Sequence, residues 1–129
     1  MALKKFRECW RGQISVIVFA LLFIPATVFA FPEKHYQEKW CAEHGGRAEV
    51  VLADKTRADC ITTTHAVEFD FGKKWAEAIG QALYYSLQTG RRAGVVLILV
   101  KPGDRKYWLR LNSTIQHFGL PIDTWEMGL

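Results

Sequence analysis

The sequence lacks the short motifs by which many enzymes and metalloproteins are identified. Its three cysteines form no C-x-x-C pair and no Cys/His spacing of a zinc site. There is no glycine-rich phosphate loop and no G-x-S-x-G, and Ser86, inside a predicted helix, offers no hydrolase triad. Repeats, low-complexity stretches and long linkers are also absent. The sequence therefore does not indicate a cysteine zinc site, a P-loop nucleotide hydrolase or a serine hydrolase.

The first thirty residues have the pattern of a secretory signal peptide. Four basic residues precede an apolar run from Ile14 to Ala30, and the small residues Val28 and Ala30 stand where a signal peptidase cleaves. We predict a signal peptide over residues 1–30 and one exported domain, periplasmic or secreted, over residues 31–129, without membrane contact after cleavage. The alternative is a retained anchor helix, for which the apolar run is at the short limit.

Loss of the signal peptide changes the charge of the chain. Residues 31–129 contain 13 Lys and Arg against 12 Asp and Glu, so the net charge falls from +4 to +1. Binding to nucleic acid must then depend on a local patch. Cys41 and Cys60 remain, and outside the cytoplasm they are expected to form a disulfide worth roughly 3 kcal/mol, the alternative being two buried thiols.

Hydrophobic periodicity predicts a small α/β domain. The order α-β-β-β-α-β is followed by a further helix and a short strand, which implies a mixed sheet flanked by helices. The predicted helices cover residues 34–44, 73–88 and 105–118. The predicted strands cover residues 47–52, 57–62, 66–71, 94–100 and 122–125.

The third predicted strand carries the most informative polar residues. Glu68 and Asp70 alternate with Val67 and Phe69, so both carboxylates leave the same face of the sheet. Asp59 on the second strand faces them if the two strands form a hairpin. Three converging acids favour a bound divalent cation, and carboxylates suit Mg²⁺ or Mn²⁺. An ordinary solvated strand face is the alternative.

The helix that follows carries candidate partners for these acids. At 100° per residue, Lys74 and Gln81 fall on one stripe, distinct from the core stripe of Trp75 and Ile79. Lys74 lies just beyond the strand, where its ammonium could orient a metal-bound water or stabilise charge on an attacked phosphate. Lys73 competes for this role, although its spacing to Glu77 is typical of a surface ion pair.

These residues resemble the PD-(D/E)xK nuclease superfamily. The resemblance rests on the element order, on Asp59 and Glu68 on consecutive strands, and on Gln81 in the helical segment EAIGQALYY. Residues 57–85 contain these motif residues, and the element order extends the resemblance over most of the exported chain. It implies a restriction-endonuclease-like core and a metal-dependent phosphodiesterase acting on nucleic acid, with DNA as the expected partner. Asp59, Glu68 and Asp70 would bind the metal, and Lys74, Gln81 and Glu38 on the first helix would be further site residues.

One position departs from the superfamily motif. The third-strand pattern is acid-x-lysine, whereas this chain has Glu68-Phe69-Asp70. Lys74 would have to replace the missing lysine; otherwise the domain would bind nucleic acid or a protein partner in the cell envelope without cutting. His65 is a weaker candidate for phosphate or metal. A predicted basic rim for the phosphate backbone comprises Arg91, Arg92, Lys101, Arg105 and Lys106.

Overall fold

The computed structural model describes residues 29–129, and the predicted signal peptide lies outside this range except for Phe29 and Ala30. The chain folds into three α-helices, five strands and two short 3₁₀ turns. Their bounds, in chain order, are α1 Glu33–Glu43, β1 Arg47–Val51, β2 Arg57–Ile61, β3 His65–Phe71, η1 Gly72–Lys74, α2 Trp75–Thr89, β4 Arg92–Ile98, η2 Pro102–Asp104, α3 Arg105–Phe118 and β5 Ile122–Met127. The predicted element order is confirmed, with ends shifted by up to two residues.

The strands form one mixed sheet in the order β1-β2-β3-β4-β5. Strand β2 pairs antiparallel with β1 and with β3, whereas β3, β4 and β5 run parallel to one another. Helix α2 connects β3 to β4, and α3 connects β4 to β5, because parallel neighbours need a crossover. Two crossovers of the same hand that advance in the same direction leave both helices on one face.

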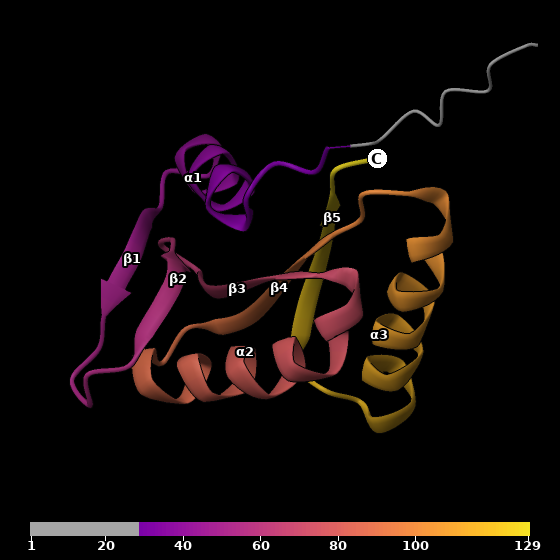
Figure 1. Ribbon diagram of the computed structural model, residues 1–129. Coiled ribbons are helices and arrows are strands. Elements are labelled where there is room, and N and C mark those ends of the chain that lie inside the picture. Colours follow the sequence, from indigo (N-terminus) through magenta and orange to yellow (C-terminus); the bar gives the residue numbers. More distant parts are fainter. Residues whose placement is uncertain (1–28) are drawn as a thin grey trace, which may run out of the picture.

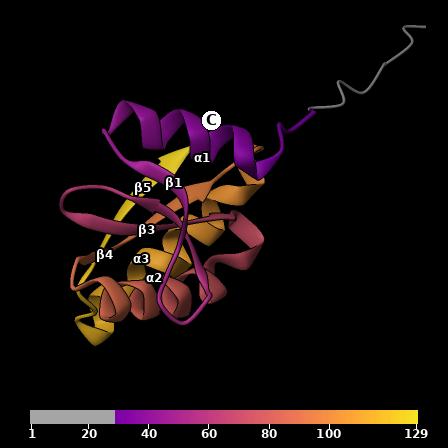
Figure 2. The same ribbon diagram turned by 90° about the vertical axis from the view of Figure 1, so that its left-hand side faces the viewer.

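The sheet is covered on both faces (Figures 1 and 2). Helix α1 packs on one face through Trp40 and Cys41, which contact Val67, Phe69 and Val96. Helices α2 and α3 cover the other face through a second apolar cluster. Its buried residues are Ala78, Ala82, Ala93, Val95, Leu97, Leu99, Leu111 and Ile122. The interior strand β4 is buried on both faces, as its uninterrupted apolar sequence predicts.

Helix α1 is fixed to the sheet by the predicted disulfide between Cys41 and Cys60. Gly46 follows the helix and passes directly over the two sulfur atoms, because a Cβ at this position would lie 2.6 and 2.8 Å from them. The bond closes a short loop around β1 and joins α1 to β2. Such a disulfide is typical of proteins that function in an oxidising compartment.

One apolar side chain at the periphery departs from the helical pattern. Its spacing from Leu111 and Ile115 predicts that Phe118 faces inward, yet Phe118 is 70% exposed, because α3 ends at this residue and Gly119 turns the chain in the left-handed conformation. Leu111 alone on this helix is fully buried. None of the helices within residues 29–129 is long and apolar enough to span a membrane.

Candidate functional site

The acidic residues lie where β2 and β3 separate, a region that we call the fork. The two strands pair only through Cys60 with Val67 and Ile61 with Ala66, beyond which no further pairing holds them together. The N–H of Phe69 then lacks a backbone partner on β2 and donates instead to the Asp59 carboxylate, at 2.9 Å. Asp59 thereby stabilises the free edge of β3 and lies beside the acids of that strand.

Glu68 and Asp70 face α2 from the centre of the sheet. In the parallel register they lie beside Val95 and Leu97 of β4, which belong to the core under this helix. Their exposed fractions are 4% and 3%. Glu68 Oε2 and Asp70 Oδ2 are buried without a hydrogen-bond partner within the described chain. Burying a carboxylate without pairing it costs several kcal/mol, so these two atoms require a partner or a proton.

The fork accordingly retains protons at neutral pH. Burial, followed by the charges of Asp59 and Asp70, raises the pKa of Glu68 from 4.5 to about 10. Burial raises the pKa of Asp70 from 3.8 to about 7, although the Lys74 ammonium acts in the opposite direction. Burial also raises the pKa of Asp59, while the hydrogen bond from Phe69 opposes the shift. The raised pKa favours the protonated form of Glu68 at pH 7, beside Asp59.

Lys74 reaches the fork from the start of α2. Its ammonium lies 3.7 Å from Asp70 Oδ1, while 57% of its side chain stays exposed to solvent. The 3₁₀ turn η1 makes this contact, since it places Lys74 one turn after Asp70. Lys73 points elsewhere, and the surface ion pair predicted with Glu77 is not among the ion pairs of residues 29–129. Lys74, and not Lys73, is the lysine beside the acids.

Two further acids near the fork were missed by sequence reasoning. Glu33, in the first turn of α1, is close enough that burial and the charge of Asp59 raise its pKa. Glu49 lies on β1 opposite Asp59, with a left-handed φ of 56° that is uncommon for a non-glycine residue. Neither glutamate lies in a sequence pattern that marks it as a site residue. In β1, the left-handed conformation of Glu49 also interrupts an otherwise regular strand.

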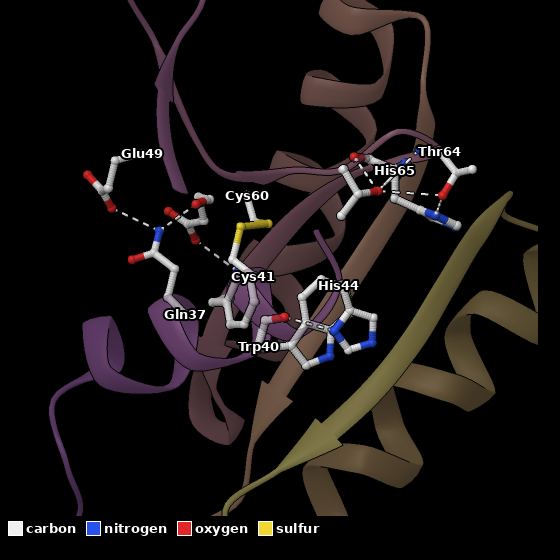
Figure 3. The surroundings of a disulfide bond; sticks show 11 residues. Gln37, Trp40, Cys41, His44, Glu49, Cys60, Thr64 and His65 are labelled. Carbon is white, nitrogen blue, oxygen red and sulfur yellow. Dashed lines mark hydrogen bonds between the residues drawn. A yellow bond between two sulfur atoms is a disulfide. The ribbon is translucent and has the colours of Figure 1, made fainter. Parts of the chain in front are cut away.

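Gln37 of α1 fixes this part of the sheet. Its side-chain N–H donates to Glu49 Oε1 and to the backbone oxygen of Asp59, both at 2.8 Å. Figure 3 shows Gln37 reaching toward Glu49 beside the Cys41–Cys60 disulfide. Helix α1 therefore holds β2 at two consecutive residues, by hydrogen bond at Asp59 and covalently at Cys60.

Gln81 approaches the fork only through another residue. Its Oε1 accepts a hydrogen bond of 3.3 Å from the Tyr85 hydroxyl, and no hydrogen bond joins it to the three acids in residues 29–129. Tyr85 is buried next to them: burial and the charges of Glu68 and Asp59 raise its pKa to about 12. Tyr85 is thus the residue of α2 that lies over Glu68.

Several other predicted candidates lie away from the fork. Glu38 is exposed on α1 and pairs with Lys34 at 3.6 Å. His65 begins β3 at its opposite end, where it contacts Asp123 at 2.7 Å. Within residues 29–129, no three His, Cys, Asp or Glu side chains are already arranged to hold a metal ion.

The basic rim predicted from the sequence is not one surface. Arg92 is the first of the seven residues of β4 and pairs with Asp123, whereas Lys101 and Arg105 follow the strand and Arg105 pairs with Glu126. The length of the strand, roughly 20 Å at about 3.3 Å per residue, separates the two groups. A basic surface near the acids can include only the second group.

Comparison of the chain with protein-family models, with curated proteins and with solved structures finds no match.

Proposed function

We propose that the chain is an exported, metal-dependent nuclease whose fork binds one Mg²⁺ or Mn²⁺. The observation that carries this proposal is the pair of buried carboxylate oxygens, on Glu68 and Asp70, that have no hydrogen-bond partner. Side-by-side acids in a protein core are destabilising unless they serve a ligand. An oxygen-only ligand set of Asp59, Glu68 and Asp70 suits these ions.

Binding would couple to the protons that the fork retains. A cation requires ionised carboxylates, so the proton on Glu68 must leave as the ion enters. Since the acids are not yet arranged as ligands, their side chains would turn once the proton on Glu68 is gone. When bound, the ion supplies activation of water and neutralisation of phosphate charge.

The surrounding residues have separate roles in this proposal. Lys74 is half exposed beside Asp70, where it would bind a phosphate oxygen next to the acids. It would thereby take the role of the lysine that the superfamily motif has at the position of Asp70. Asp59 keeps β3 in place through the N–H of Phe69. Tyr85 and Gln81 close the fork on the side of α2.

The fold supports the same proposal. The order α-β-β-β-α-β is present, with the acids on its second and third strands at the point where these separate. We propose that this is a restriction-endonuclease-like core, related to the PD-(D/E)xK nucleases. Asp70, where the motif has lysine, favours a second candidate: a domain of the same kind that binds nucleic acid or an envelope protein without cutting.

Cleavage by residues 31–129 tests the proposal. This chain retains the entire described core, because every buried apolar residue lies between Tyr36 and Ile122. Linear DNA, circular DNA and RNA would be incubated with Mg²⁺, Mn²⁺ or EDTA. We expect metal-dependent cleavage that Glu68→Gln abolishes and that Glu38→Gln, on the exposed face of α1, leaves unchanged. A folded protein that cuts none of these substrates would support the non-enzymatic candidate.

A further inference from the structure

A cavity of about 360 Å³ lies at the carboxyl ends of β3 and β4. One wall comes from the end of β3 and η1, the other from the end of β4 and η2. Its lining residues in the predicted exported chain are Phe71, Gly72, Lys73, Val100, Lys101 and Asp104, whereas Ala30, which also lines it, belongs to the predicted signal peptide and is absent from residues 31–129. Ligands of open α/β sheets bind outside the carboxyl ends of the strands, and the size is in the range of small-ligand sites.

The cavity adjoins the fork. Phe71 directly follows Asp70 at the end of β3, and because successive strand residues point to opposite faces, the two side chains flank the same edge of the sheet from its two faces. On η1, Lys73 lines the cavity while its neighbour Lys74 contacts Asp70. A single strand that crosses this edge of the sheet would therefore contact both the acids and the cavity.

The lining combines an apolar surface with an excess of positive charge, two lysines against one aspartate. Phe71 and Val100 are half-buried, whereas Lys73 and Lys101 are exposed and form no ion pair within residues 29–129. Asp104, the acid of the lining, is buried and forms hydrogen bonds within the chain. Its Oδ2 accepts the N–H groups of Val100 at 3.0 Å and Lys101 at 3.3 Å. The cavity is thus complementary to a flat apolar group that carries a phosphate.

We propose that this cavity binds one unpaired nucleotide of a single-stranded nucleic acid, a substrate preference that rests on the proposed nuclease function. The base and sugar contact Phe71 and Val100, and the phosphate lies between Lys73 and Lys101. Unstacked bases bind aromatic side chains in this way, whereas the bases of a duplex are paired and stacked and do not enter. Phosphate contacts by lysine position the strand without reading its sequence.

Binding in EDTA tests the proposal without cleavage. Residues 31–129 would be titrated against a fluorescent single-stranded oligonucleotide and a hairpin duplex of equal length, followed by anisotropy at several salt concentrations. We expect tighter binding of the single strand. Lys73→Ala with Lys101→Ala should weaken it and reduce its salt slope by about 1.4, since each phosphate contact to a single strand contributes about 0.7. Arg47→Ala with Arg91→Ala, at the opposite end of the sheet, is the charge-matched control.

Three results would overturn the proposal: equal affinity for duplex and single strand, a double variant that binds like the parent chain, or displacement of the oligonucleotide by polyglutamate as readily as by nucleic acid. The outcome is distinguishable from that of the nuclease proposal. Cleavage unaffected by Lys73→Ala and Lys101→Ala leaves a nuclease without this subsite. The expected binding pattern with no cleavage in any metal leaves a single-strand binding domain.

Discussion

Without metal, the protein should lose stability as the pH rises from 5 to 8. The folded state holds protons that the unfolded chain releases, because the pKa of Asp70 is about 7 against an ordinary 3.8 and that of Glu68 is about 10 against 4.5. For carboxyls with a raised folded pKa, the stabilising contribution is complete below the unfolded pKa. It is lost as the pH rises through the folded pKa.

The size of the effect can be worked out for Asp70. One extra proton in the folded state changes the free energy of unfolding by at most about 1.4 kcal/mol per pH unit. Between pH 5 and 7 the limit is therefore about 3 kcal/mol. The exposed ammonium of Lys74 and the water around it screen the carboxylate, so we expect about half of this value.

Urea unfolding in EDTA, followed by tryptophan fluorescence, measures this loss. Asp70→Asn cannot ionise, so between pH 5 and 7 it should gain about 1–2 kcal/mol relative to the parent chain. Glu38→Gln, a change on the exposed face of α1, should run parallel to the parent at every pH. With Mg²⁺ present the sign should reverse, because the ion binds the ionised acids and stabilises the fold more at higher pH. Parent and Asp70→Asn curves that stay parallel in EDTA would refute the reasoning.

Two other substitutions test the fold. Replacing Cys41 and Cys60 with alanine should lower the free energy of unfolding by about 3 kcal/mol on the chain-entropy model, measured by urea titration; a loss below about 1 kcal/mol would contradict it. Lys55→Gly should raise the free energy of unfolding by about 0.5–1 kcal/mol, and with it the urea midpoint. This exposed residue has a φ of 74°, which glycine adopts without strain. A lower midpoint would show that the lysine side chain stabilises the turn.

The sequence predicted the elements and the face on which the acids lie. Alternation along β3 placed Glu68 and Asp70 together, because a strand has a period of two and one face must be covered. The hairpin between β2 and β3 then brought Asp59 beside them, and the helical period placed Lys74 near the same acids, whereas Gln81 of the same stripe reaches them only through Tyr85. These relations are local in the chain, which is why periodicity could find them.

Other features of the site depend on tertiary structure. No pattern indicates that β2 and β3 separate after two paired positions or that Glu49 adopts a left-handed conformation. Sequence reasoning chose Glu38 from α1, but the packing of this helix turns Gln37 and Glu33 toward the sheet instead. The basic rim failed for a similar reason, since residues close in sequence were separated by the length of β4.

A titration of residues 31–129 with Mn²⁺ at neutral pH, followed by calorimetry, tests the central claim most directly. We predict one bound ion per chain with release of protons, lost in Glu68→Gln and retained in Glu38→Gln. A folded chain that binds no Mn²⁺, or one whose affinity is unchanged by Glu68→Gln, would contradict the proposal that the fork is a metal site.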